Sequence, residues 1–400
     1  MNNYDEALEI IKREFREIKL LTEEHDLYDA IDRVIAEDIT ADIDLPPFDN
    51  SAVDGYAISY SNKNEWKIIG EVSAGNYQTY QLKPEDAVLI TTGSKIPITT
   101  DTVIPIEDVE VDGSILRLKK NVIIEKGMNI RPKGNDLQKN QIAVQKFTKI
   151  DSKVISVLAS CGIEKAKVFR KLQTAILATG DELIPVNEKP TEDKIRVSNI
   201  YSLYAAVKEL NQSPISLGFI KDSKELLQQK IKEVLDTNVD LLITTGGVSV
   251  GKYDYLKEIF NEVGVVEKFW KVNIKPGKPI YFGVYSKNNS KKLVFGLPGN
   301  PVSSLVTFNI FIKPAIEYLY KLKTINSINA ILNNDLKKKD GKRHFLRGIL
   351  EQEGSEWKVI SKFSQSSGNL VEMSKANCLI EIVEEKRNLS KGDNVKCILI

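Results

Sequence analysis

Histidine and cysteine are scarce in this chain of 400 residues. The two histidines are His25 and His344, and the three cysteines are Cys161, Cys378 and Cys397, far apart and without CxxC spacing. These numbers exclude a histidine-rich metal site and make a structural zinc site or a disulfide scaffold a poor interpretation. A small and odd number of cysteines is typical of proteins in a reducing compartment, so the sequence predicts a cytoplasmic protein.

The chain also lacks an excess of either charge. It carries 56 basic and 55 acidic residues, for a net charge of +1, which argues against nucleic acid as a partner. The first twenty residues contain five acids and resemble no secretory signal. Residues 293–312 are uncharged but contain Pro298 and Pro301, which favours a strand, a tight loop and a helix start over a membrane span.

Hydrophobic periodicity divides the chain into regions of different predicted secondary structure. A prior of about 150 residues per domain predicts two to four domains. Helical spacing appears at residues 4–18, 27–35 and 150–160, and β texture at 65–120, with an Asp112-Gly113 hairpin signal. From residue 171 strands and helices alternate, which predicts a largely parallel sheet, and a long helix follows at 302–322. Residues 323–334 are polar and predict a linker, and short strands from 344 to 400 predict a small barrel or sandwich.

A glycine-rich loop at 244–251 follows an apolar strand and precedes a helix. Its backbone amides could hold an anion at the helix start. The segment Gly247-Val248-Ser249-Val250-Gly251 also fits the nucleophile elbow of serine hydrolases, but the only later histidine is His344, in a separate terminal region. A tight turn without a ligand is the third interpretation.

Lysines concentrate between residues 264 and 292, where seven lysines face one acid, Glu267. Two of them, Lys275 and Lys278, flank a Pro-Gly turn whose stiffness suits a phosphate or another oxyanion. A solvated surface is the alternative. The segment 297–303, Leu-Pro-Gly-Asn-Pro-Val-Ser, could likewise be a stiff connection or a backbone platform for a flat ligand.

Acidic residues recur in loops rather than on helix faces. With histidine and cysteine so rare, a catalytic metal would have to use carboxylates, and loop carboxylates beside a substrate phosphate suit Mg²⁺. Helix capping or turn formation is the alternative for each one singly. These loop acids are Asp49, Asp54, Asp136, Asp181, Glu182, Asp222 and Asp254.

Taken in order, the motifs resemble the MoeA family of molybdopterin molybdenumtransferases, which is related to the E domain of gephyrin. The resemblance covers nearly the whole chain, and the ordered set is far more specific than any one piece. The matching segments are 47–57, Thr92-Gly93, 131–136, 178–183, 245–251, 275–279, 297–303, Arg343 and Arg347 around Phe345, 365–368 and 376–380.

The resemblance implies a multidomain α/β and β architecture. An elongated, discontinuous linker domain would comprise 1–46 and 137–170, and a β-rich domain would be inserted at 47–136. Residues 171–326 would form a doubly wound α/β domain similar to the molybdopterin-binding protein MogA, and 327–400 a C-terminal β-barrel. The family is typically a homodimer, with each site completed by the β-rich domain of the other subunit.

The implied reaction inserts molybdenum from molybdate into adenylylated molybdopterin, with Mg²⁺-dependent cleavage of the phosphoanhydride and release of AMP. The resemblance implies Lys275, Lys278, Ser303, Arg343 and Ser366 or Ser367 as molybdate ligands. It implies catalytic roles for Asp54, Thr92, Glu182, Asp222 and Asp254, of which Glu182, Asp222 and Asp254 would hold the metal. Molybdopterin and AMP would bind Arg131, Asp136, Gly246, Gly247, Ser249, Gly251, Pro298, Asn300 and Pro301, and Asp54, Thr92, Arg131 and Asp136 would come from the second subunit.

The sequence departs from the family pattern near the expected metal side. Val197 and Lys252 stand where relatives often carry acids, and Val53 replaces a methionine beside Asp54. Two alternatives remain: a MogA-like molybdopterin adenylyltransferase, or a non-catalytic molybdopterin-binding scaffold. The implied partners are the adenylylating MogA-like enzyme and the recipient molybdoenzymes, with neither nucleic acid nor a membrane.

Overall fold

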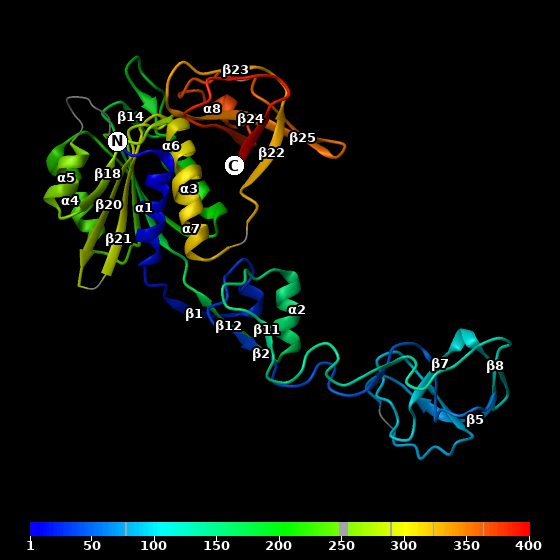
Figure 1. The fold of residues 1–400 in the computed structure, drawn as a ribbon. Coiled ribbons are helices and arrows are strands. Elements are labelled where there is room, and N and C mark those ends of the chain that lie inside the picture. Colours follow the sequence, from blue (N-terminus) through cyan, green and yellow to red (C-terminus); the bar gives the residue numbers. More distant parts are fainter. Residues whose placement is uncertain (77, 248–254, 289, 323, 363) are drawn as a thin grey trace. The chain divides into compact units, whose positions relative to one another are not determined.

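The computed structural model describes residues 1–400 except 77, 248–254, 289, 323 and 363 (Figure 1). The chain forms two compact units. The larger unit comprises residues 1–23 and 169–400, and the smaller unit residues 24–168. The finer division into four domains stays a prediction.

The smaller unit contains a six-stranded sheet in the order β7-β4-β6-β5-β9-β8. Trp66, which is 1% exposed, packs in its core with Ile58, Ile104 and Leu116. The hairpin expected at Asp112-Gly113 is confirmed, since β8 and β9 pair across it with Asp112 opposite Ile115. The strands are β4 (Gly55–Ile58), β5 (Glu65–Val72), β6 (Asp86–Ile90), β7 (Thr102–Pro105), β8 (Val109–Asp112) and β9 (Ile115–Leu118), and the short helix η2 spans Ile106–Asp108.

Short elements make up the rest of residues 22–169. Three two-stranded sheets pair β1 with β12, β2 with β11 and β3 with β10. Their bounds are β1 (Thr22–Asp26), β2 (Ile39–Thr40), β3 (Asn50–Ser51), β10 (Ile130–Arg131), β11 (Ile142–Val144) and β12 (Lys165–Phe169), and the expected helix near 150–160 is α2 (Ser152–Ser160).

The helix expected at 27–35 is wrong. Only the short 3₁₀ helix η1 (Leu27–Asp29) forms there, and Asp32 takes a positive φ of 63°. Val34 and Ile35 instead form β-bridges to Lys149 and Val168. Ile35 is fully buried, so tertiary pairing of β-branched residues outweighs the local helical spacing.

The larger unit contains a second six-stranded sheet in the order β16-β13-β17-β21-β20-β18. Its first four strands are parallel, whereas β20 and β18 pair antiparallel, so the expected largely parallel sheet is confirmed. Figure 1 shows α4 and α5 on one face and α1, α3, α6 and α7 on the other. The strands are β13 (Gln173–Thr179), β16 (Ser213–Ile220), β17 (Leu241–Thr245), β18 (Val266–Trp270), β20 (Tyr281–Lys287) and β21 (Ser290–Leu297). The helices are α1 (Tyr4–Arg16), α3 (Asn199–Glu209), α4 (Lys224–Leu235), α5 (Leu256–Glu262), α6 (Pro301–Thr307) and α7 (Lys313–Leu319).

The uncharged run 293–312 folds as the sequence predicts. It begins within β21, turns at residues 298–300 and enters α6, where Pro301 occupies the first turn. A π-helical segment at Phe308–Ile312 joins α6 to α7 and completes the expected long helix. Among the described residues, every helix is too short or too polar to pass through a bilayer.

Five strands of the larger unit close into a C-terminal β-barrel, in the order β24-β25-β22-β28-β26 with β26 pairing back to β24. The linker expected at 323–334 is wrong over half of its length, because β22 pairs there with β28 and β25. Ile328, Ala330 and Leu332 alternate toward the barrel core, and Asn329 and Ile331 lie between them. The strands are β22 (Ser327–Leu332), β24 (Arg343–Glu353), β25 (Glu356–Ile360), β26 (Cys378–Ile382) and β28 (Asn394–Leu399). The remaining short elements of the larger unit are β14 (Leu183–Ile184), β15 (Ile195–Arg196), β19 (Ile274–Lys275), β23 (Leu336–Lys337), β27 (Asn388–Leu389) and α8 (Leu370–Met373).

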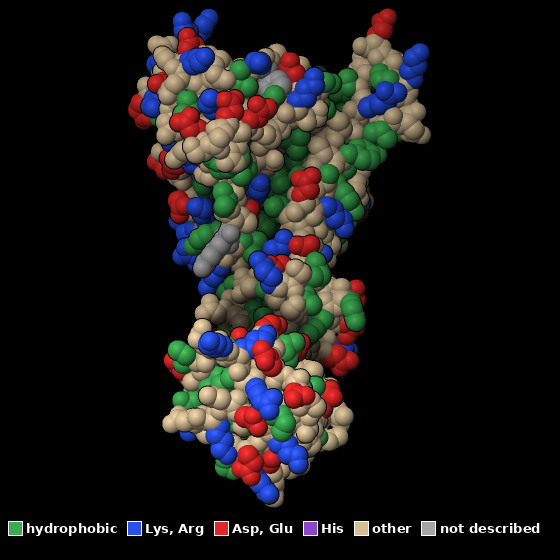
Figure 2. All heavy atoms as spheres, turned by 90° about the vertical axis from the view of Figure 1, so that its right-hand side faces the viewer, with side chains coloured by type: hydrophobic (Ala, Val, Ile, Leu, Met, Phe, Trp, Pro, Cys, Tyr) green, Lys and Arg blue, Asp and Glu red, His purple; other side chains and the backbone are tan. Residues whose placement is uncertain are grey.

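Helix α1 belongs to the larger unit despite its position in the chain. It begins with a capping box in which Asn3 and Glu6 exchange hydrogen bonds. Tyr4 lies 5.4 Å from the ring of Phe311 and 5.1 Å from that of Phe345. On the face shown in Figure 2, basic and acidic side chains are intermixed.

Candidate functional site

Four parallel strands of the larger unit end at the same edge of the sheet. Register places Thr179 opposite Ile220, and Thr245 opposite both Ala178 and Leu297. The loops that follow these strands carry Glu182, Asp222, Gly246 with Gly247, and Pro298 to Pro301. The structure therefore brings these predicted residues to neighbouring loops, where parallel α/β sheets bind ligands.

Position 246, at this edge of the sheet, requires glycine. Its φ is +97°, and a Cβ there would collide with the carbonyl oxygen of Thr179. Its N–H donates to the carbonyl of Leu297 at 3.3 Å, and a Cβ on Gly299 would lie 3.3 Å from its Cα. The loops after β17 and β21 are thus in backbone contact.

Carboxylates gather in the loops after β13 and β16. The hydroxyl of Thr179 donates to Asp222, and the Asp222 N–H donates to Asp181 at 3.2 Å. The Glu182 carboxylate folds back over Gly180. Within the described part of the chain, no three His, Cys, Asp or Glu side chains are placed to hold a metal ion. Asp254, Ser249, Gly251 and Lys252 lie outside the described residues.

A pocket of about 270 Å³ collects most of the predicted molybdate ligands. Lys275, Lys278, Ser303 and Ser367 all line it. The N–H of Val302 donates to the carbonyl of Ser367 at 3.2 Å, which joins the 365–368 loop to the start of α6. The pocket is thus built between the lysine-bearing turn, α6 and the barrel.

Arg347 lines this pocket, whereas the predicted ligands Arg343 and Ser366 do not. Arg347 is 1% exposed, and its guanidinium donates to the carbonyls of Ser364, Ser366 and Asn369. Burial lowers the pKa of Arg347. The two arginines lie four residues apart on β24, so strand alternation gives them the same face, and the sequence offered no signal to separate them.

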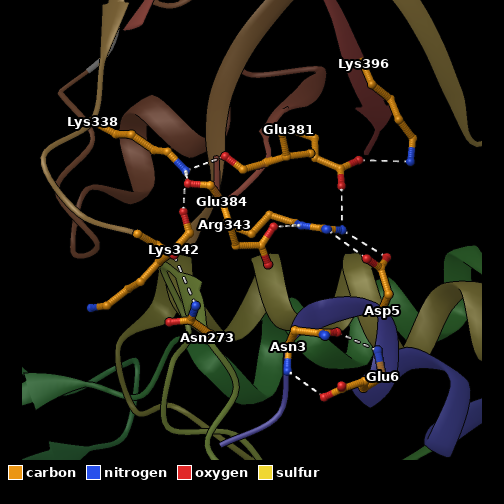
Figure 3. Close-up of polar contacts among 12 residues, drawn as sticks. Asn3, Asp5, Glu6, Asn273, Lys338, Lys342, Arg343, Glu381, Glu384 and Lys396 are labelled. Atoms are coloured by element: carbon orange, nitrogen blue, oxygen red, sulfur yellow. Dashed lines mark hydrogen bonds and ion pairs between the residues drawn. The ribbon is translucent and has the colours of Figure 1, made fainter. Parts of the chain in front are cut away.

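Arg343 is instead held by three carboxylates (Figure 3). It pairs with Asp5 at 2.8 Å, Glu381 at 3.1 Å and Glu384 at 2.9 Å. Burial alone would lower the pKa of Arg343, but the hydrogen bonds and charges of these partners raise it. Arg343 therefore joins α1 to the barrel, and its contact with molybdate stays a prediction.

The other five lysines of the 264–292 stretch are not among the pocket residues. Lys268 and Lys291 pair with Glu14, Lys287 pairs with Asp236, Lys292 donates to the carbonyl of Thr237, and Lys271 lies over the ring of Trp270. These five lysines therefore make structural contacts, and Lys292, which is 4% exposed, does not lie on the solvated surface that was the alternative interpretation. Of the seven lysines in this stretch, Lys275 and Lys278 are the two that line the pocket.

One acid lies beside the pocket lysines. Asp340 is 4.0 Å from the Nζ of Lys275 and 2.7 Å from the Nε2 of His344. Burial lowers the pKa of His344, and Asp340 opposes this shift only in part. The histidine that a serine hydrolase would require is therefore buried in a structural contact.

The predicted residues of the smaller unit form two pairs beside β3. Asp54 accepts from the N–H of Thr92 at 2.7 Å and from its hydroxyl at 2.8 Å, and these bonds lower the pKa of Asp54. Asp136 pairs with Arg131 at 2.7 Å, and the amide of Asn135 followed by Arg131 lowers the pKa of Asp136. Arg131 is the β-partner of Asn50, and the N–H of Gly93 donates to Ser51 at 2.8 Å, which places both pairs beside the same strand.

Comparisons with known proteins match most of the chain, including the residues of the candidate site. Family models match in order: the MoeA N-terminal region (domain I and II) at residues 2–162, a probable molybdopterin binding domain at 175–318, and the MoeA C-terminal region (domain IV) at 329–400. A molybdopterin molybdenumtransferase of Haemophilus influenzae is 36% identical over 94% of this chain and 93% of its own length. One from Bacillus subtilis is 34% identical over 94% and 89%. A molybdopterin biosynthesis MoeA protein of Pyrococcus horikoshii superposes with a TM-score of 0.83, 29% identity and full coverage of both chains. The chain belongs to the MoeA family of molybdopterin molybdenumtransferases.

Proposed function

We propose that this protein inserts molybdenum from molybdate into adenylylated molybdopterin and releases AMP. The observation that carries the proposal is the pocket in which Lys275, Lys278 and Arg347 meet Ser303 and Ser367, in a chain of this family. Molybdate is a tetrahedral dianion, and a site with several cations and hydroxyls neutralises its charge and satisfies its oxygens. The sparse cysteines, all three of them buried and unpaired, suit the cytoplasmic location that is part of the proposal.

The carboxyl-edge loops would hold the second substrate. In this proposal Gly246, Gly247, Ser249 and Gly251 bind the phosphate of molybdopterin, and Pro298, Asn300 and Pro301 form a platform for the pterin. The reaction needs no covalent nucleophile, because fixed charges and donors around an anhydride stabilise its cleavage. The chain's own residues therefore act by binding and orienting both substrates.

Glu182, Asp222 and Asp254 would hold Mg²⁺. Carboxylate oxygens are ligands that Mg²⁺ prefers. The N–H of Asp222 donates to Asp181, the neighbour of Glu182, across the loops after β16 and β13. When bound, Mg²⁺ would offset the negative charge of the phosphoanhydride. We expect EDTA to abolish AMP release and added Mg²⁺ to restore it.

The proposal includes a homodimer, with Asp54, Thr92, Arg131 and Asp136 lent by the second copy. Apolar side chains remain exposed on and before α3, with Ile195 55%, Tyr201 57% and Tyr204 37% exposed. Such residues on one segment suit a contact with a second copy. Transient contacts with the adenylylating MogA-like enzyme and with recipient molybdoenzymes belong to the same proposal.

The test is AMP release from adenylylated molybdopterin with molybdate and Mg²⁺, measured by chromatography. We expect Lys278→Ala to raise the KM for molybdate at least ~10-fold, as loss of a charged contact implies. Lys287→Ala is the matched control, because this lysine of the same stretch pairs with Asp236 outside the pocket. Absence of AMP from the wild-type protein contradicts the proposal. Consumption of ATP with molybdopterin would indicate the adenylyltransferase, and binding without turnover a scaffold.

A further inference from the structure

Asn199 is the first residue of α3, and its side chain joins two loops of the candidate site. The residue is 9% exposed. Its Nδ2 donates to the hydroxyl oxygen of Thr245 at 2.7 Å and to the carbonyl of Gly299 at 2.8 Å. Thr245 ends β17 just before Gly246, and Gly299 lies in the loop after β21.

The protons in this network can be assigned from the chemistry of the groups. The carbonyl of Gly299 can only accept. The hydroxyl of Thr245 donates its single proton to the carbonyl of Pro298 at 3.1 Å, so it must accept from Asn199. Both bonds therefore require the amide NH₂, and the carboxylate of an aspartate cannot replace it.

The two joined loops are already in contact through glycine. Gly246 donates to Leu297, and Gly299 approaches the Gly246 Cα. Neither contact involves α3. Asn199 ties both loops to this helix, which packs on β13 and β16 of the same sheet.

We propose that Asn199 is a positioning residue that holds the 246–247 and 298–301 loops in one arrangement for the phosphate end of adenylylated molybdopterin. The proposal rests on the proposed function and deepens it. Asn199 acts through the two loops and does not itself line the pocket of Lys275 and Lys278. Binding of the two substrates should therefore respond differently to its loss.

The experiment compares Asn199→Asp with the wild-type protein. Calorimetric titration with adenylylated molybdopterin should show binding weakened ~10-fold, since the lost donors of a buried amide are worth about one to two hydrogen bonds. The KM for molybdate should change less than this binding does, because Asn199 contacts the two loops and does not line the molybdate pocket. Thr245→Val removes the accepting hydroxyl at constant shape and should weaken binding in the same direction, so the test survives if Asn199→Asp fails to fold.

Asn377→Asp is the control for loss of a bridging amide elsewhere. Asn377 joins the N–H and carbonyl of Leu350 in the barrel, at 2.7 and 2.8 Å. It should change neither substrate constant. Unchanged binding of adenylylated molybdopterin in both Asn199→Asp and Thr245→Val overturns the inference, as does an equal loss for both substrates. A wild-type protein that binds this substrate but releases no AMP overturns the proposed function alone, because the titration needs no turnover.

Discussion

At the scale of single residues, Asp340 is an internal anion beside Lys275. An acid 4.0 Å from an ammonium group competes with an incoming oxyanion for that charge. Asp340→Asn should lower the KM for molybdate by up to ~5-fold, the range of a partly exposed ion pair. The asparagine can still hydrogen-bond His344, so the local structure is retained. Initial rates at varied molybdate measure the effect.

Asp236→Asn is the companion variant, because Asp236 pairs with Lys287 away from the pocket. It should leave the KM unchanged. A higher KM in Asp340→Asn would show that Asp340 orients Lys275 instead of competing for it.

Glu14 links α1 to the sheet of the larger unit and gives stability a pH dependence. Burial would raise the pKa of Glu14, but hydrogen bonds from Lys291 and Lys268 lower it below the ordinary 4.5. The folded state therefore binds its proton less readily than the unfolded state. The stabilisation is full above about pH 4.5 and is lost as the pH falls through the folded value.

We expect Glu14→Gln to lower the free energy of unfolding at pH 7 by about 1–3 kcal/mol, as for charged hydrogen bonds. Urea unfolding of both proteins at pH 7 and in acid measures it. The difference between them should shrink in acid; a difference that is constant with pH would rule out the ionised carboxylate as its source.

The sequence predicted residue types at the site better than their individual roles. Lys275, Lys278, Ser303 and Ser367 meet in one pocket as the family motifs imply. The sequence could not show which of Arg343 and Arg347 lines the pocket. The acids that form ion pairs with Arg343 are residues 5, 381 and 384, which lie far from it in the sequence. Such partners are set by tertiary packing, which periodicity does not contain.

At the scale of elements, the loop after β17 depends on a residue without a side chain. Gly246→Ala should abolish detectable AMP release, because the new Cβ would force the loop away from Thr179. Gly392→Ala isolates the backbone cost: Gly392 has a φ of +98°, nearly that of Gly246, but open space around it. AMP release and the unfolding temperature should be measured for both.

Backbone strain should cost each alanine variant about 1 kcal/mol of stability. The contact with Thr179 should destabilise Gly246→Ala further, whereas Gly392→Ala meets open space. Only Gly246→Ala should lose activity beyond that cost. Retained AMP release in Gly246→Ala would mean that the loop tolerates displacement.

Elements with strong periodicity were predicted well from sequence, and the failures have a common cause. Strands and helices alternate over residues 173–262, as the sequence predicts from residue 171 onward. Residues 27–35 and 327–332 were misassigned because distant strands decide their conformation. Val34 and Ile35 pair with residues beyond 145, and β22 pairs with β28.

At the scale of the whole molecule, the proposal that each site is shared between two copies predicts complementation. Asp54→Asn alters the smaller unit and Lys278→Ala the larger unit, and at molybdate concentrations well below KM each variant alone should release little AMP. Co-expressed with different tags, half of the randomly mixed dimers would pair unlike chains and hold one intact site. Activity should then recover to about a quarter of wild type.

Co-expression of Lys275→Ala with Lys278→Ala is the control, since both changes affect the same pocket and no pairing restores it. No recovery with Asp54→Asn would indicate that each chain builds its site alone. Light scattering on the purified mixture establishes whether dimers are present.

Helix α1 is synthesised long before the residues that it packs against. Its partners Phe311 and Phe345, and the Arg343 that pairs with Asp5, are translated some 300 residues after it. At ribosomal speeds of 5–20 residues per second, the helix waits roughly 15–60 s before they exist. The capping box of Asn3 and Glu6 can form at once, but the apolar side of the helix cannot be covered. Although α1 is the first helix to leave the ribosome, it completes its packing only after β24 has been made. Until then the nascent chain exposes the apolar face of α1, to which chaperones can bind.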